Sequence, residues 1–354
     1  NWLSAVLTAI EVPMVVGKTT VSVSATAGAA IGPTDGRDAE TLLHRASLAL
    51  RRAKDTSRGW FAFFKTGMDE LVRQRALFEH DLWNAVRNDE IAPHFQPLVS
   101  LEDGKPRGYE ILARWTHVTR GPIPPDQFIP TAEASGAIGE LTFNLLRRAC
   151  REAVAIEGAP HLSLNLSPVQ LQDDELAQKL FKVLEEENFP PARLEIELTE
   201  AALVTDLDAA REILHALRDK GVRVALDNFG TGHASLLQLR KLPFDKLKID
   251  RSFVRRMTED AESATLVRTI ISMAKNLGLA VVAEGVETAD QAKALAALGC
   301  DMGQGFHFGR ASKSLGPRQP GEGKQRKPAP PRPQAEAEQA ATQPEPALLA
   351  SLAD

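Results

Sequence analysis

Three short runs decide the fold of this chain: RLEIELTE (193–200), VRVALDN (222–228) and DKLKID (245–250). In each run, β-branched and other apolar residues lead to a polar residue at the end, which is typical of a buried strand. Residues 209–220 lie between the first two runs and repeat apolar positions at helical spacing. Strands that alternate with helices in this way predict a parallel sheet covered by helices.

The alternation of strands and helices continues on both sides of residues 193–250. Further strands are predicted at 92–99, 107–115, 161–167, 279–285 and 303–308, and further helices at 134–156, 168–187, 262–277 and 289–298. Eight strands in about 220 residues favour a closed (β/α)8 TIM-like barrel of the α/β class. An open doubly wound sheet is the alternative.

The residues on either side of the barrel differ from it in pattern. Residues 1–66 predict a small N-terminal α/β fragment, and residues 67–88 predict an amphipathic helix that leads into the barrel. We therefore place the barrel at 89–313. Residues 314–354 hold eight of the 22 prolines and too few apolar residues to offset the entropy of ordering, so we expect a disordered tail. A Pro-rich partner motif in that tail is the alternative.

Charge and cysteine content exclude several classes of protein. The net charge is −5 and the pI about 6.0, which argues against a DNA- or RNA-binding protein, because that affinity depends on an excess of Lys and Arg. Cys150 and Cys300 form neither a disulfide framework nor a zinc spacing, which favours the cytoplasm. No run approaches the roughly 18 apolar residues of a membrane span. Because the chain opens without Met, we expect a piece of a longer protein with an upstream sensor domain or membrane anchor.

Polar residues gather at the ends of the predicted strands. In a barrel the carboxyl ends of the strands meet at one mouth, where catalytic residues lie. A single carboxylate at a strand end is usually a helix cap or a surface residue, but four in succession favour a site. Carboxylates that share a cavity repel each other unless cations lie between them, and oxygen ligands suit Mg²⁺ or Mn²⁺ better than zinc. The residues concerned are Glu110, Asn165, Glu197, Asp227, Lys248 and Glu284.

Two segments allow two interpretations each. Lys248 lies between Leu247 and Ile249, so it is either a solvated surface lysine or a cation that faces a phosphate. The HFQP segment (94–97) offers an aromatic ring and an amide that either contact a base or pack in the core.

Taken in order, these segments resemble the EAL family of cyclic di-GMP phosphodiesterases over residues 75–312. Each motif alone is short and weak, whereas the whole series at fitting separations is specific. The matching segments are GYEILARW (108–115), LNLSP (164–168), ELTE (197–200), DNFGTG (227–232), KID (248–250), AEGVE (283–287), QGF (304–306) and the QP pair at 96–97.

The resemblance implies a two-metal enzyme that opens cyclic di-GMP to linear pGpG. The implied ligands of two Mg²⁺ or Mn²⁺ ions are Glu110, Asn165, Glu197, Asp227, Asn228 and Glu284, with Asp227 bridging. The implied catalytic residues are Glu284, Lys248, Glu200, Glu287 and Gln304, with Glu200 bracing the loop at 228–236. The implied substrate contacts are Gln96, Leu112, Arg114 and Asp250. The loop also implies a homodimer formed through the barrel.

The sequence departs from the family pattern at informative positions. Asn228 stands where a second Asp is common, and the loss of a charge there weakens the second metal site. Ile111 replaces the usual Ala and is expected to alter packing only, because it points away from Glu110 in a strand. Residues 1–66 resemble the C-terminal half of a GGDEF domain without its signature loop, and Ser47 replaces a usual Asp, which implies a noncatalytic remnant.

Three functions follow as hypotheses. The first is an active cyclic di-GMP phosphodiesterase, with activity reduced or manganese-dependent because of Asn228. The second is a receptor that binds cyclic di-GMP without cutting it. The third is a scaffold that binds partners through the Pro-rich tail.

Overall fold

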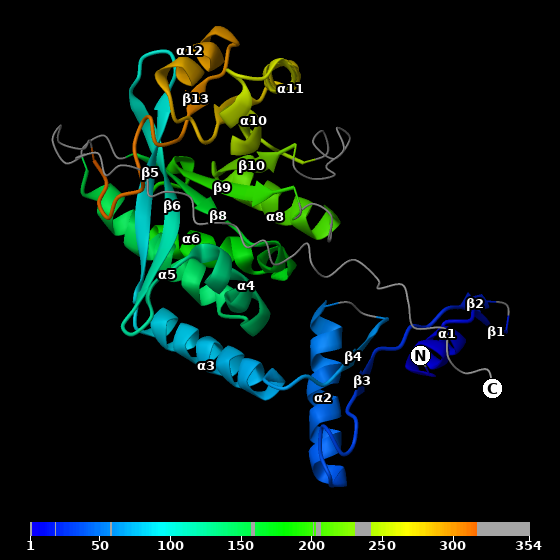
Figure 1. Cartoon of the computed structure of the whole chain (residues 1–354). Coiled ribbons are helices and arrows are strands. Elements are labelled where there is room, and N and C mark those ends of the chain that lie inside the picture. Colours follow the sequence, from blue (N-terminus) through cyan, green and yellow to red (C-terminus); the bar gives the residue numbers. More distant parts are fainter. Residues whose placement is uncertain are drawn as a thin grey trace. The chain divides into compact units, whose positions relative to one another are not determined.

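One sheet carries most of the architecture (Figure 1). The computed structural model describes residues 2–17, 19–56, 59–156, 160–200, 202, 207–230 and 242–316. Within these residues the sheet has nine strands. They are β5 (Ile91–Ser100), β6 (Pro106–His117), β7 (Gly121–Ile123), β8 (His161–Asn165), β9 (Leu194–Thr199), β10 (Arg223–Phe229), β11 (Lys246–Ile249), β12 (Ala280–Ala283) and β13 (Met302–Gly303).

Eight of these strands close into a barrel, as predicted. The order runs β5-β13-β12-β11-β10-β9-β8-β6, and β5 also pairs with β6, which completes the ring in the described part of the chain. An open doubly wound sheet is therefore excluded. Around this ring the strands from β6 to β13 are parallel neighbours, whereas β5 is antiparallel to both β6 and β13. The expectation of a wholly parallel sheet is wrong here, because only residues 101–105 join β5 to β6, too few for a crossover.

The strand predicted at 303–308 is also shorter than expected. The β13 strand ends at Gly303, and the chain then turns back on the loop after β12. Val286 N donates to the carbonyl of Gln304 at 3.0 Å, and His307 N donates to the carbonyl of Val286 at 3.0 Å. A Cβ at Gly305 would lie 2.2 Å from the Val286 carbonyl oxygen, so only glycine permits this approach. The turn brings Gln304 to the end of the barrel instead of extending the sheet.

Helices cover the outside of the barrel (Figure 1). They are α4 (Pro125–Ser135), α5 (Ile138–Val154), α6 (Leu176–Glu186), α8 (Leu207–Asp219), α10 (Arg251–Arg256), α11 (Ala261–Asn276) and α12 (Ala289–Ala297), with 3₁₀ turns η1 (Pro168–Gln172) and η2 (Pro191–Arg193). The helix predicted at 134–156 is divided, because Gly136 ends α4 in the left-handed conformation. The helix predicted at 168–187 begins with η1, capped by Ser167, and continues as α6.

The core lies between these helices and the strands. Leu141, Leu145 and Leu146 recur at helical spacing on α5 and are all buried. Each fully buried leucine stabilises the fold by about 2 kcal/mol relative to an exposed one. Trp115, at the end of β6, is buried against Phe128 of α4 in an edge-to-face contact.

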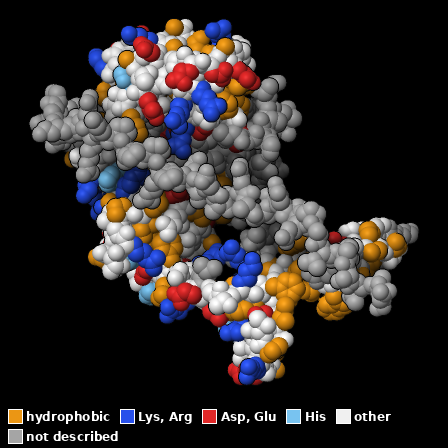
Figure 2. All heavy atoms as spheres, viewed as in Figure 1, with side chains coloured by type: hydrophobic (Ala, Val, Ile, Leu, Met, Phe, Trp, Pro, Cys, Tyr) orange, Lys and Arg blue, Asp and Glu red, His pale blue; other side chains and the backbone are white. Residues whose placement is uncertain are grey.

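The N-terminal residues form smaller units. The elements are α1 (Trp2–Ile10), β1 (Met14–Val16), β2 (Thr19–Val21), β3 (Ala27–Ala29), α2 (Ala39–Thr56), β4 (Phe61–Phe63) and α3 (Met68–Arg87). Gly28 in β3 lies so close to α2 that a Cβ would sit 2.1 Å from Leu50 N. Hydrophobic side chains are exposed on this part of the chain (Figure 2). Trp2 and Trp60 are among them. The boundaries at 66, 88 and 313 stay predictions.

Two further expectations concern a membrane-spanning segment and the C-terminal tail. In the residues that the structure describes, no helix is both long enough and apolar enough to cross a membrane. Most of the predicted tail, from residue 317 to 354, lies outside the described residues.

Candidate active site at the barrel mouth

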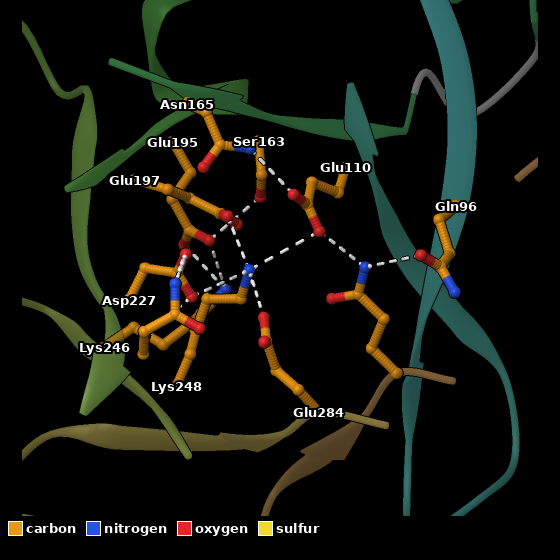
Figure 3. A network of polar contacts seen from close by, with 12 residues as sticks. Gln96, Glu110, Ser163, Asn165, Glu195, Glu197, Asp227, Lys246, Lys248 and Glu284 are labelled. Carbon is orange, nitrogen blue, oxygen red and sulfur yellow. Dashed lines mark hydrogen bonds and ion pairs between the residues drawn. The ribbon is translucent and has the colours of Figure 1, made fainter. Parts of the chain in front are cut away.

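The strands place their predicted polar residues at one end of the barrel. Glu110 lies in β6, Asn165 ends β8 and Glu197 lies in β9. Asp227 and Lys248 lie near the ends of β10 and β11, and Glu284 directly follows β12. Side chains alternate between the two faces of a strand, so residues of one parity point into the barrel. Figure 3 shows these six side chains converging on one point.

Lys248 lies at the centre of this group. Its Nζ is 2.5 Å from Oε2 of Glu197 and 2.6 Å from Oε1 of Glu284. The same atom lies 3.5 Å from Oε2 of Glu110 and 3.5 Å from Oδ1 of Asp227. Lys248 is 0% exposed. The interpretation of Lys248 as a solvated surface lysine is therefore wrong.

Two side-chain amides donate hydrogen bonds to the Glu110 carboxylate, one to each oxygen. Asn165 Nδ2 donates to Oε1 of Glu110 at 2.7 Å, and Gln304 Nε2 donates to Oε2 at 2.5 Å. Gln304 Nε2 also lies 3.3 Å from Oε1 of Gln96, a residue of β5. Side chains from β5, β6, β8 and the segment after β13 are thus joined in one network. Phe95, next to Gln96, is fully buried, so the aromatic ring of the HFQP segment packs in the core.

The buried charges of the mouth alter one another's ionisation. Burial opposes the charged form of Lys248, but Glu110, Glu197, Glu284 and Asp227 outweigh it and hold the pKa of the ammonium well above its usual value. Burial also opposes ionisation of Glu110. The Lys248 ammonium and the hydrogen bonds from Gln304 and Asn165 nevertheless lower the pKa of that carboxyl. Lys248 is therefore a cation, and Glu110 an anion, at neutral pH.

Two other carboxyls are shifted in the opposite direction. Burial, followed by repulsion from Glu110 and Asp227, raises the pKa of Glu197 well above its usual value despite the Lys248 ammonium. Burial and the same neighbours raise the pKa of Glu284 to about 7. One ammonium thus faces four carboxyl groups. The mouth carries more acidic groups than its own cation can neutralise.

A cavity of about 370 Å³ opens above this group. Its lining residues are Gln96, Glu110, Asp227, Asn228, Asp250, Arg251, Glu284, Gly285, Glu287, Gln304, Gly305 and Phe306. Asp250 accepts a hydrogen bond from Ser252 N through Oδ1 at 2.8 Å and so begins α10 at the cavity edge. The volume lies within the range of small-molecule sites, which is about 300–1,000 Å³.

Six residues predicted for the site lie outside this lining. Three of them, Asn165, Glu197 and Lys248, belong to the network beneath the cavity, and the other three lie apart from it. Leu112 and Arg114 follow Glu110 on β6, and Arg114 Nη1 donates to the carbonyl of Ala113 at 2.9 Å. Glu200 follows β9, and its Oε1 accepts a hydrogen bond from Gly230 N at 3.0 Å. Glu200 thus holds the first residues of the loop at 228–236, of which residues 231–236 lie outside the described part.

Asn228 interacts closely with the neighbouring carboxylate. Its backbone N donates to Oδ1 of Asp227, and its Nδ2 donates to Oδ2, each at 2.9 Å. The residue has a φ of 56°, a left-handed conformation in which Asn is one of the better tolerated side chains. Both oxygens of Asp227 therefore accept hydrogen bonds from Asn228.

The donor set suits a divalent cation in its chemistry. Glu110, Asn165, Glu197 and Asp227 offer oxygen atoms, which Mg²⁺ and Mn²⁺ prefer. Oε1 of Glu197 and Oε1 of Gln304 are buried and have no hydrogen-bond partner among the described residues. Among those residues no group of three or more His, Cys, Asp or Glu side chains is arranged as a metal cage. Nζ of Lys248 lies between the carboxylates, so cations would enter from the cavity side.

Several residues of this region are not singled out by the sequence pattern. Arg251 and Phe306 line the cavity, and Phe306 is 54% exposed beneath the guanidinium of Arg310, 3.7 Å from its ring centre. Lys246 and Glu195 form a second buried ion pair one layer deeper in the barrel. The two-residue period of a strand would have revealed that pair, because each member precedes a predicted site residue by two positions.

Comparison with known proteins gives a consistent result. The family model described as EAL domain matches residues 79–311. An uncharacterized signaling protein of Caulobacter vibrioides is 43% identical over 283 residues, which cover 80% of this chain and 35% of that protein. In Pseudomonas aeruginosa, a protein named cyclic di-GMP phosphodiesterase NbdA is 37% identical over 302 residues, 84% of this chain and 39% of its own.

A solved structure gives the same picture in three dimensions. The structure named PaMucR phosphodiesterase, c-di-GMP complex, has a TM-score of 0.63 and 37% identity, covering 67% of this chain and 97% of the solved one. The chain spans between a third and a half of the length of the curated relatives it matches.

Proposed function

The chain belongs to the EAL domain family, and on that basis we propose that its barrel hydrolyses cyclic di-GMP to linear pGpG with the help of divalent cations. The observation that carries the proposal is the convergence of four carboxyl groups on one buried lysine beneath an open cavity. Relatives named cyclic di-GMP phosphodiesterase and a solved relative in complex with c-di-GMP support the choice of substrate.

The excess of acidic groups supports the need for metal. Cyclic di-GMP carries two phosphodiester charges, so it would be repelled from a mouth in which one ammonium faces several carboxylates. We assign Glu110, Asn165, Glu197 and Asp227 as ligands of two Mg²⁺ or Mn²⁺ ions, with Asn228 and Glu284 completing the second position. When bound, such ions supply Lewis acidity that activates water and neutralises charge on the phosphate.

Lys248 acts as a fixed cation in this proposal. Its pKa is held well above the usual value by four surrounding carboxyls, so it cannot take a proton from water at neutral pH. It can donate hydrogen bonds to an attacking oxygen or to a phosphate oxygen at the floor of the cavity. Its burial fixes the position of Nζ, which reduces the reorganisation needed during the reaction.

Glu284 and Gln304 complete the arrangement around the reacting phosphate. We assign Glu284 as the base partner because its Oε1 lies 2.6 Å from Lys248 Nζ at the cavity wall. Burial raises its pKa to about 7 in the metal-free protein. Gln304 orients Glu110 through Nε2, and its buried Oε1 is available to accept a hydrogen bond from water. Glu287, exposed at the cavity edge, is placed to act on groups that enter from solvent.

The walls of the cavity are proposed to hold the nucleotide. Gln96 and Asp250 line the cavity and offer polar atoms to a base or a ribose. Leu112 and Arg114 lie further along β6, and we assign them to the outer part of the substrate. Glu200 is assigned a positioning role, because it holds Gly230 at the start of the loop.

Turnover of cyclic di-GMP by the full chain tests the proposal. The reaction is run with Mg²⁺ and separately with Mn²⁺, and the product is resolved by chromatography. We expect pGpG from the wild type and none from Glu110→Ala, with an exposed control, Glu259→Ala, unchanged. Absence of pGpG in both metals, with no binding of cyclic di-GMP, would overturn the proposal.

One observation favours a second candidate function, a receptor that binds cyclic di-GMP without cutting it. Asn228 donates to both oxygens of Asp227, the residue assigned to bridge the metals, and so competes with metal coordination. Saturable binding of cyclic di-GMP without pGpG in excess Mg²⁺ and Mn²⁺ would select this function.

The wider organisation of the protein is also a matter of proposal. We propose a cytoplasmic domain that forms a homodimer through its barrel, downstream of a sensor domain in a longer chain. The segment at 1–66 is proposed as a remnant of a GGDEF domain, the helix at 67–88 as a connector and the tail at 314–354 as disordered.

A further inference from the structure

A second cavity lies at the opposite end of the barrel interior, at the amino ends of the parallel strands. We call it the foot cavity. Its volume is about 230 Å³. Its lining residues are Leu98, Arg107, Gly108, His161, Ser163, Glu195, Arg223, Lys246 and Met302. His161, Arg223 and Lys246 are the first residues of β8, β10 and β11. Barrel interiors are usually filled with branched apolar side chains at this depth. The charged side chains that line the foot cavity are therefore unusual and need an explanation.

One ion pair in the foot cavity is balanced. Lys246 Nζ lies 2.6 Å from Oε2 of Glu195 and 2.8 Å from Oε1, and Ser163 Oγ donates to Oε1 at 3.0 Å (Figure 3). The side chain of Glu195 is 2% exposed and that of Lys246 is 10% exposed. Glu195 is therefore neutralised by Lys246, and its negative charge is not available to a second cation.

Arg223 is the second cation of the foot cavity. Its Nη2 contacts the imidazole of His161, and no carboxylate pairs with it among the described residues. Its Nε is buried and has no hydrogen-bond partner there. Burial, together with Arg223 and Lys246, lowers the pKa of His161, which keeps the imidazole neutral as an acceptor. The inner cavity thus has a net positive charge and an unused donor.

Arg107 extends the positive charge toward solvent. It lines the foot cavity, and its side chain is 52% exposed while it pairs with Asp103 at 2.9 Å. A surface ion pair of this kind is weak, so the guanidinium can exchange partners at little cost. Arginine suits oxyanions in particular, because its donors match two oxygens at once.

We propose that the foot cavity binds a small oxyanion of the phosphate class, held by Arg223 and Lys246 with Arg107 at its opening. The anion would satisfy the buried donor of Arg223 and neutralise the surplus charge. It would lie at the beginning of strands whose other ends carry Asn165, Asp227 and Lys248. The proposal does not depend on the proposed hydrolysis at the mouth.

Thermal unfolding of the full chain with inorganic phosphate tests this site. Metal is removed with EDTA, so that the acidic mouth repels the probe, and chloride at equal ionic strength is the reference. We expect phosphate at tenfold excess over Kd to raise the Tm of the wild type by about 3–5 °C. Arg223→Gln should remove that gain and weaken phosphate binding by about ten- to a hundredfold in calorimetry.

The controls separate a built site from a general salt effect. Arg268→Gln changes an exposed arginine on α11 and should keep the full gain. If Arg223→Gln fails to fold, Arg107→Gln replaces it, with the gain expected to fall by at least half. Equal gains in the wild type and in the foot variants, or no saturable binding of phosphate by the wild type, would overturn the proposal.

Discussion

The two ends of the barrel interior use the same residue types and reach opposite charge. At the mouth, Lys248 faces Glu197 together with Glu284, Glu110 and Asp227. Two residues earlier on the same strands, Lys246 pairs with Glu195, and Arg223, which has no carboxylate partner among the described residues, leaves that layer positive. Successive inward residues are about 6.6 Å apart along a strand. A Glu–Lys pair therefore does not define a site by itself; the surplus charge around it does.

The comparison shows which sign of charge each end of the barrel needs from a bound ion. Buried charges persist only when they are paired or bound to an ion. The mouth lacks positive charge, which divalent cations would supply, and it opens into the larger cavity of about 370 Å³. Among the described residues, Glu195 is the one carboxylate that lines the foot cavity, and Lys246 neutralises it, so loss of that carboxylate should leave hydrolysis nearly intact.

The largest expected effect comes from the matched substitutions Glu197→Gln and Glu195→Gln. Each keeps the shape of the side chain and removes one charge. Glu197→Gln should lower the rate of cyclic di-GMP hydrolysis by about a thousandfold, because it removes a metal ligand, whereas Glu195→Gln should lower it less than about fivefold. The rates are measured by chromatography of pGpG at saturating Mg²⁺. Comparable losses in both variants would contradict the assigned difference between the ends.

The two lysines should differ in how metal affects stability. Lys248→Met and Lys246→Met each remove the ammonium that pairs directly with a buried carboxylate and should destabilise the metal-free protein by about 3 kcal/mol in urea unfolding. Saturating Mg²⁺ should restore most of that loss at the mouth, since cations take over the role of the ammonium there. It should restore none at the foot.

A further substitution serves as the control for this pair. Glu195→Gln in the Lys246→Met background removes the stranded charge and should recover stability without metal. Recovery of both lysine variants by Mg²⁺ would show that the foot also accepts cations, which contradicts its assignment as an anion site.

The mouth should also lose stability as the pH rises, opposite in sign to the effect of His161 at the foot, whose pKa is lowered. Burial raises the pKa of Glu284 to about 7 from its ordinary 4.5, so between those values the folded protein binds more protons than the unfolded one. Stability of the metal-free protein should therefore fall by about 2–3 kcal/mol as the pH rises from 4.5 to above 7. Urea unfolding at pH values of about 5 and about 8 measures the change.

The contribution of Glu284 is isolated by comparison with variants. Glu284→Gln should lose this part of the pH dependence, and Glu259→Gln, at an exposed position, should keep it. An unchanged pH dependence in Glu284→Gln would assign the effect to other groups.

The smallest expected effect is a gain. Asn228→Asp removes the hydrogen bond from Nδ2 to Asp227 and adds a charged oxygen, so hydrolysis in Mg²⁺ should rise by about tenfold. Asn188→Asp is the matched control, because Asn188 has a similar left-handed φ of 53° outside the mouth. A gain of equal size in both variants would show that the conformation, and not the metal site, is responsible.

Much of this arrangement was predictable from strand patterns. Alternation places Glu197, Asp227 and Lys248 on the inner face of three strands whose carboxyl ends meet, so their convergence follows from the barrel. The same alternation applied to Glu195 and Lys246 also predicts the deeper pair. A search for only the last polar residue of each strand does not find the pair of Glu195 and Lys246.

Other features depend on contacts that no local pattern contains. Gln304 binds Glu110 although 194 residues separate them, and the turn that brings it there requires Gly305 against Val286. The antiparallel direction of β5 follows from its short link to β6. Counting strands alone does not take the length of that link into account. The neutral partner of Arg223 could be recognised only once the barrel placed His161 beside it.

Binding of Mn²⁺ by the wild type, Glu197→Gln and Glu195→Gln tests the central claim most directly. Electron paramagnetic resonance of free Mn²⁺ gives the number of ions bound per chain. We predict saturable binding of two ions by the wild type, unchanged binding by Glu195→Gln and loss of at least one ion in Glu197→Gln. No saturable binding by the wild type, or equal losses in the two variants, would contradict the assignment of the mouth as the metal site.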